Sequence, residues 1–180
     1  MNQTIRFPSW TISGPFVILL SLFLTSTLLG SPTSLRAQRT LEIQQFNVNL
    51  EVEENGEIRV MEAIQLRFTG SWNDFYRTIS VEYRNPQGFS YRLFLNLESV
   101  TDESGREMEI DVSRDGLYRK VKIWVPDAED VTRTITLRYT VPNALKFFEE
   151  HDELYWNVTG TEWDFAIHSA SALIELPPEV

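Results

Sequence analysis

The sequence predicts an all-β domain, an antiparallel β-sandwich in the style of an immunoglobulin fold, preceded by an N-terminal hydrophobic helix. Two observations predict the sandwich. Apolar residues recur at every second position in many short stretches, and turn-forming residues separate these stretches roughly every 8–12 positions. A third observation predicts the helix, because no charged side chain occurs between Phe7 and Leu35.

The uncharged stretch is expected to be a cleaved signal peptide or a membrane anchor. Its apolar core, residues 16–29, counts fourteen residues. This length favours a signal peptide, because a spanning helix needs about 20 residues. Ala37 offers a small residue for cleavage before Gln38. We expect residues 1–37 to be this leader and residues 38–180 to be one exported domain, in the periplasm or on the outer face of the cytoplasmic membrane.

The alternation predicts a series of strands in the exported part. Asn55-Gly56, between the first two, favours a type I′ hairpin turn. A slip in the alternation near Gln44–Gln45 suggests a bulge. Residues 70–77 read as a turn and an aromatic loop, and residues 143–150 as the only short helix. The expected strands cover residues 41–52, 58–68, 79–83, 91–97, 108–112, 120–125, 134–141 and 167–176.

Composition excludes several classes of function. Arg6 and Arg36 are the only charged residues before Gln38, so the net charge of −10 for the whole chain becomes −12 for the exported part. Such a surface repels nucleic acids and anionic lipids. The chain has no cysteine, which excludes disulfides and thiolate metal sites. An exported domain without cysteine is more typical of a bacterium than of a secretory pathway rich in disulfides. We expect no cofactor, no metal and no nucleic acid partner.

The densest group of functional side chains lies between residues 151 and 163. Asp152, Glu153, Trp156 and Trp163 form a candidate binding loop. Carboxylates beside tryptophans suit a carbohydrate-active site, because aromatic faces stack on sugar rings and paired carboxyl groups share acid and base work. The alternative is that the aromatic residues belong to the core and the acids to a solvated loop. In a strand, Tyr155 and Trp156 point to opposite faces, and we expect Trp156 to be the inner one.

A second candidate is a pair of opposite charges. Glu62 shares the apolar face of strand 58–68 with Ile58, Val60 and Ile64. A carboxylate on this face needs a partner, and Arg77 is expected to provide a two-point ion pair. The pair is expected to be structural or, alternatively, to line a binding site. No residue is assigned a catalytic role.

Three elements resemble the N-terminal extracytoplasmic domain of the DUF2207 family of predicted bacterial membrane proteins. They are the strand Val60–Ile64 followed by Phe68, the segment Phe75–Ile79, and the segment Glu153–Gly160 with Trp163. The resemblance covers about Leu41 to Val180. It implies an extracytoplasmic β domain in a family without an established activity, whose relatives continue into transmembrane helices.

The function expected from these observations is binding or interaction, without catalysis, in a membrane-protein system. The membrane contact would come from the leader or from missing C-terminal helices, and a protein or a glycan is the expected partner. One alternative is a carbohydrate-active site around the candidate binding loop. The other is that the chain is a truncated fragment of a longer multi-span membrane protein.

Overall fold

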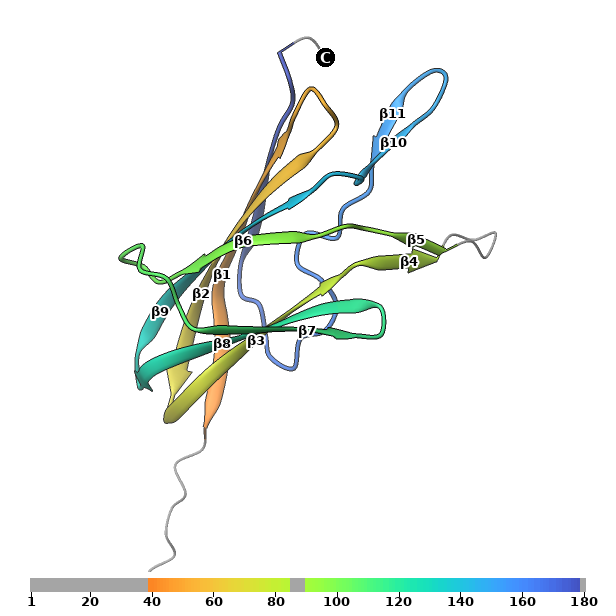
Figure 1. Ribbon diagram of the computed structural model, residues 1–180. Coiled ribbons are helices and arrows are strands. Elements are labelled where there is room, and N and C mark those ends of the chain that lie inside the picture. Colours follow the sequence, from red (N-terminus) through yellow and green to blue (C-terminus); the bar gives the residue numbers. More distant parts are fainter. Residues whose placement is uncertain (1–38, 85–89, 179–180) are drawn as a thin grey trace, which may run out of the picture. The chain divides into compact units, whose positions relative to one another are not determined.

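The computed structural model describes residues 39–84 and 90–178, which form twelve strands and no helix (Figure 1). The all-β prediction is therefore confirmed. The expected N-terminal helix and its cleavage point lie outside the described residues. Within the described part, no helix could cross a membrane.

The larger sheet has five strands, in the spatial order β12-β1-β2-β9-β6. Most of its neighbours are antiparallel, as the alternation predicts, but β12 runs parallel to β1. The predicted antiparallel arrangement is therefore present, with this one parallel pair of strands as an exception. The strands are β1 (Thr40–Val52), β2 (Ile58–Thr69), β6 (Asn96–Thr101), β9 (Thr132–Val141) and β12 (Ala170–Glu175).

The smaller sheet has three antiparallel strands in the order β3-β8-β7, and two short hairpins complete the domain. The chain passes from β2 to β3 across Gly70 alone, and from β8 to β9 across Asp130 and Val131. Figure 1 shows these two corners at the lower end, where the sheets meet before they splay apart. The strands are β3 (Ser71–Ser80), β4 (Glu82–Arg84), β5 (Ser90–Arg92), β7 (Ile110–Asp115), β8 (Tyr118–Glu129), β10 (Leu145–Phe147) and β11 (Asp152–Leu154).

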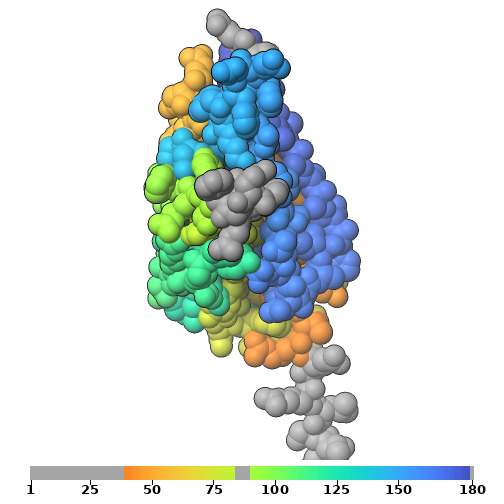
Figure 2. Space-filling view, turned by 90° about the vertical axis from the view of Figure 1, so that its right-hand side faces the viewer, coloured from red at the N-terminus to blue at the C-terminus, as the bar shows by residue number. Residues whose placement is uncertain are grey.

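One hydrophobic core lies between the two sheets. Phe46 of β1 and Phe75 of β3 face it from opposite sides, and both are fully buried. The connection from β11 to β12 closes the open side of the sandwich. Trp163 in this connection packs edge-on against Phe46 (ring centroids 5.8 Å apart) and stacks on Phe75 (6.0 Å). Figure 2 shows the C-terminal segment, in blue, as a continuous strip over this side.

The first hairpin forms where the sequence predicts it, with a different turn. A type I′ turn needs a positive φ at both central residues. Only Gly56 has one (φ 81°). Glu53 accepts a hydrogen bond from the Gly56 amide, and its own amide donates to Glu57, each at 2.9 Å. This is a three-residue loop with a glycine bulge. The bulge expected near Gln44–Gln45 is present between Ile43 and Gln45.

Two other expectations are wrong. The segment expected as a turn and loop, residues 70–77, is mostly strand β3, because it pairs with β8 from Ser71 to Ser80 across a bulge at Trp72–Asp74. The segment expected as a helix, residues 143–150, contains β10, which pairs with β11. In both segments strand pairing overrides the local preference, with the distant strand β8 in the first and with the next strand, β11, in the second.

Candidate functional site

Strand β2 places a carboxylate inside the core. Its buried and exposed residues alternate, so Glu62 shares the inner face with Val60 and Ile64, and its exposed fraction is 0%. Arg77 of β3 is on the inner face of the other sheet and is 2% exposed. The two charges therefore face each other across the sandwich, because the corner at Gly70 folds β3 back over β2.

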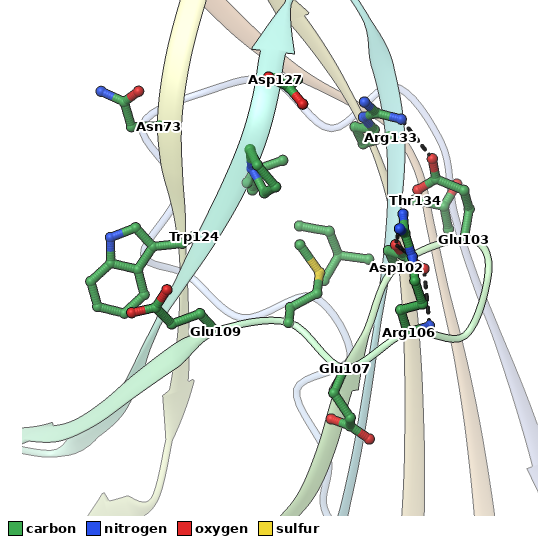
Figure 3. Close-up of a pocket in the computed structure, with 14 residues that line it drawn as sticks. Asn73, Asp102, Glu103, Arg106, Glu107, Glu109, Trp124, Asp127, Arg133 and Thr134 are labelled. Carbon is green, nitrogen blue, oxygen red and sulfur yellow. Dashed lines mark hydrogen bonds and ion pairs between the residues drawn. The ribbon is translucent and has the colours of Figure 1, made fainter.

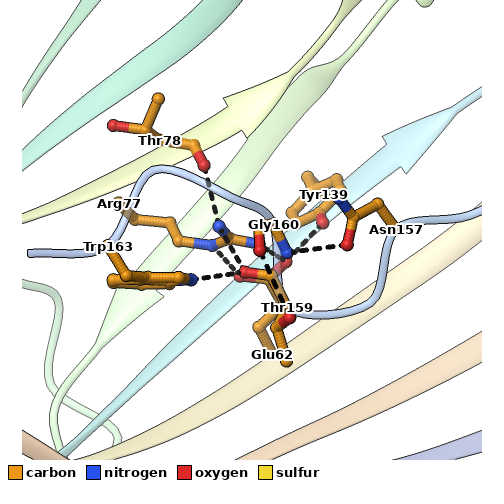
Figure 4. A network of polar contacts seen from close by, with 8 residues as sticks. All are labelled: Glu62, Arg77, Thr78, Tyr139, Asn157, Thr159, Gly160 and Trp163. Atoms are coloured by element: carbon orange, nitrogen blue, oxygen red, sulfur yellow. Dashed lines mark hydrogen bonds and ion pairs between the residues drawn. The ribbon is translucent and has the colours of Figure 1, made fainter. Parts of the chain in front are cut away.

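The contact expected between Glu62 and Arg77 is present, and it has two points (Figure 4). Arg77 donates from Nε to Glu62 Oε2 at 2.6 Å and from Nη2 to Oε1 at 2.7 Å. The Tyr139 hydroxyl of β9 donates to the same Oε1 at 2.7 Å. Both carboxylate oxygens are thus satisfied in the core, which is what a buried charge requires.

The connection between β11 and β12 completes this network. Arg77 Nη1 donates to the carbonyl of Thr78 at 2.8 Å and to that of Thr159 at 3.2 Å. Trp163 Nε1 donates to the same Thr159 carbonyl at 2.7 Å. Gly160 lies against the guanidinium with φ 81°, and a Cβ there would be 2.9 Å from Arg77 Nη1. Only glycine fits both this conformation and this space.

The charges in the network stabilise one another. Burial lowers the pKa of Arg77, but the charge and hydrogen bonds of Glu62, with smaller contributions from Tyr139 and Tyr83, raise it above the usual arginine value. Burial, and then the negative charge of Glu62, raise the pKa of Tyr139 well above the usual tyrosine value. The guanidinium also lies 5.2 Å from the centroids of the Phe46 and Trp163 rings. The network thus joins both sheets to the connection that covers them.

The structure does not gather the candidate binding loop into one site. Asp152 and Glu153 are exposed neighbours on β11, and Glu153 lies 3.8 Å from the Lys146 ammonium. Asp152 and Trp156 line a groove of about 630 Å³ between the β1–β2 and β10–β11 hairpins. Trp163 lines a separate groove, of about 1140 Å³, beside β3.

The two tryptophans of this loop have packing partners in the core. Trp156 is half-buried and stacks on Tyr139 with ring centroids 6.4 Å apart, whereas Tyr155 is 63% exposed. As expected, Trp156 faces inward and Tyr155 faces outward, although Trp156 is not fully buried. Among the described residues, its indole nitrogen is buried without a hydrogen-bond partner.

A pocket of about 760 Å³ that the sequence did not predict lies between the segment that precedes β7 and strands β8 and β9 (Figure 3). Its floor is apolar and consists of Met108, Val125 and Ile135. Trp124 of β8 forms one wall. Figure 3 shows Glu109 beside the Trp124 ring and Asp127 at the upper rim. The ring already holds one cation, because the Lys122 ammonium lies 4.6 Å from its centroid.

The opposite wall of this pocket carries two ion pairs. Arg106 contacts Asp102 at 2.8 Å, and Arg133 contacts Glu103 at 2.9 Å. Hydrogen bonds from Ser104, and further ones from Arg106, hold the pKa of Asp102 far below its usual value. A hydrogen bond from its own backbone amide, and then Arg133, lower the pKa of Glu103.

Three further carboxylates of the pocket, those of Glu107, Glu109 and Asp127, form no ion pair within the described part of the chain. The pocket therefore has a negative charge that its own arginines do not balance. Glu107 and Glu109 are two positions apart in the sequence. This spacing is the same whether two carboxylates line a pocket or lie on the solvent-exposed face of a strand. The sequence carried no sufficient signal for this site.

Comparisons with known proteins give one family and a set of distant structural likenesses. The family model described as the N-terminal domain of a predicted membrane protein (DUF2207) matches residues 42–180. Comparison with curated proteins gives no match. Leukotriene A4 hydrolase from yeast, in complex with bestatin, is 14% identical with a TM-score of 0.43, covering 58% of this chain and 15% of that one. An M1 zinc metallopeptidase from Deinococcus radiodurans is 13% identical with a TM-score of 0.41, covering 58% and 21%. These scores are too low to support an argument.

Proposed function

The chain belongs to the DUF2207 family of predicted membrane proteins, and from this premise we propose that it is a non-catalytic binding domain on the outer side of a bacterial membrane. The pocket of Figure 3 is its binding site. The ligand is a positively charged segment of a protein partner. The family description and the uncharged stretch from Phe7 to Leu35 support a membrane location and export.

The observation that carries this proposal is the make-up of the pocket. Its apolar floor suits the methylene chain of a lysine or arginine side chain, and the contact of the Lys122 ammonium with the Trp124 ring shows that this aromatic wall accepts a cation. Glu109 and Asp127 supply negative charge at the mouth. The overall net charge of −10 adds a field that attracts a basic partner from a distance.

The placement of the candidate binding loop favours binding over the carbohydrate-active alternative. A glycosidase needs two carboxyl groups that face one sugar ring. Asp152 and Glu153 are neighbours on one strand and therefore point to opposite faces of it. Trp163 packs against Phe46 and Phe75 and supports the core.

Calorimetric titration of the full chain in a nonionic detergent tests the proposal, with tetralysine as the probe and tetraglutamate as the control peptide. We expect tetralysine alone to bind, and added salt to weaken it, because exposed charges are screened. Glu109→Gln should weaken binding about fivefold, which corresponds to about 1 kcal/mol for one exposed charge. Glu54→Gln, at the distant β1–β2 turn, is the matched control. Equal binding of the two peptides, or unchanged binding in Glu109→Gln, contradicts the proposal.

A further inference from the structure

Strand β12 is an edge strand that the rest of the described chain leaves uncovered. All six of its residues are exposed, although its sequence is mostly apolar. Leu173 and Ile174, which are neighbours and point to opposite faces, are 56% and 51% exposed. Figure 2 shows the blue C-terminal segment along the right-hand outline of the molecule.

The pairing of β12 with β1 fixes which backbone groups face outward. Phe46 of β1 donates its amide to the Ser169 carbonyl at 2.9 Å. In a parallel ladder, the residues that bond to one neighbour alternate with those that bond to the other side. Ser169, Ser171 and Leu173 therefore face β1. The amides and carbonyls of Ala170, Ala172 and Ile174 face outward.

The other edge of the same sheet is protected, and β12 is not. On β6, the Val100 carbonyl accepts a hydrogen bond from the Met108 amide at 2.9 Å, and the strand has a bulge between Leu97 and Ser99. Covered edges, bulges and charges are the devices that prevent strand association. From Ser169 to Ile174 the chain has no charge, no proline and no bulge against β1.

We propose that β12 pairs antiparallel with β12 of a second copy of this chain, about a two-fold axis at Ala172. This is the register in which all three outward-facing residues pair. Ala172 meets Ala172 of the second copy, and Ala170 meets Ile174, which gives six backbone hydrogen bonds across the axis. Ser171 lies opposite Leu173, so a small side chain faces a large one at each end.

The uncharged strip is complementary to itself in this register, and this is the reason to favour a second copy. Two molecules with a net charge of −10 repel each other, so they can associate closely only through an uncharged surface. Antiparallel pairing at Ala172 brings uncharged strips together and places each Glu175 opposite Ser169 of the second copy. The two sheets then form one continuous sheet with closed two-fold symmetry. This association does not depend on the ligand of the pocket in Figure 3.

Cysteine cross-linking tests this proposal, because the natural chain has no cysteine. In the proposed dimer the two Ala172 Cα atoms are about 5.5 Å apart, within the range for a disulfide or a short thiol cross-linker. We expect the full chain with Ala172→Cys, in detergent, to cross-link efficiently to a dimer. Ser104→Cys, in an exposed turn remote from β12, is the matched control and should not cross-link to a covalent dimer.

Two further variants separate pairing of this edge from other association. Ala172→Pro removes an outward-facing amide and no hydrogen bond to β1. Ala172→Lys keeps the backbone and places two ammonium groups at the axis. We expect each to convert the dimer to a monomer in sedimentation experiments without loss of the β-sheet circular dichroism signal. A monomeric natural chain, a dimer that persists in Ala172→Lys, or equal cross-linking of the Ser104→Cys control would overturn the proposal.

Discussion

Removing either member of the buried ion pair should destabilise the domain strongly, and removing both should cost less than the sum. In Arg77→Ala, the Glu62 carboxylate remains buried with Tyr139 as its donor. In Glu62→Ala, the guanidinium keeps only the Thr78 and Thr159 carbonyls. Each variant therefore leaves an uncompensated charge in the core, and we expect each to lower the free energy of unfolding by about 3–5 kcal/mol.

In the double variant no charge of the pair remains buried without its partner. Independent losses would add to about 6–10 kcal/mol, and we expect the double variant to lose about 2–3 kcal/mol less than this sum. Urea unfolding followed by tryptophan fluorescence measures all four proteins of the cycle. Glu54→Ala, an exposed carboxylate, is the control and should change stability by less than about 0.5 kcal/mol. Strictly additive losses would refute the reasoning, as would a loss below about 1 kcal/mol in either single variant.

Three further predictions concern the same region. Trp163→Phe should lower the free energy of unfolding by about 1–2 kcal/mol, because the Trp163 indole donates a hydrogen bond to the Thr159 carbonyl. Trp156→Phe should be nearly neutral, because the Trp156 indole nitrogen has no hydrogen-bond partner among the described residues. Equal losses for the two variants in urea unfolding would contradict this prediction. Gly160→Ala should cost more than Gly105→Ala by at least about 1 kcal/mol, since both glycines have φ 81° but only the first would contact Arg77; equal thermal melting temperatures would show that the contact is unimportant. The raised pKa of Tyr139 means that folding favours the neutral phenol, so this stabilisation is complete below the unfolded pKa of about 10 and is lost as the pH rises through the higher folded value. In an alkaline absorbance titration, Tyr139→Phe should remove one of the tyrosines that ionise only as the domain unfolds. If the variant instead lacks one of the tyrosines that ionise in the folded domain, the prediction is wrong.

The sequence predicts strands best where one face of a strand is buried. The alternation from Ile58 to Phe68 locates β2, and its parity alone puts Glu62 inside. The same argument fails for β3, because Ser71 and Asn73 are turn formers and their strand conformation depends on the pairing of β3 with β8. The sequences of β1 and β12 do not predict that these two strands pair in parallel, because the path of the chain between them determines this contact.

The pocket of Figure 3 shows a different limit of prediction. Its residues come from β3, β8 and β9 and from the turn before β7, and no two of these segments carry a motif together. Asp127 adopts φ 55°, a conformation that nothing in the local sequence demands. Such a site becomes visible only when the two sheets are placed over each other.

The parallel contact between the first and last strands has a consequence for the order of folding. Asn47 of β1 and Ser171 of β12 are 124 positions apart and share a side-chain hydrogen bond of 2.8 Å. A chain that emerges from its N-terminus can form the β1–β2 hairpin early, but β1 must wait until β12 has been synthesised before its second neighbour exists. Such long-range pairing slows folding and leaves an uncovered strand exposed in the meantime. During synthesis, β1 is therefore the segment on which we expect a chaperone to act for the longest time.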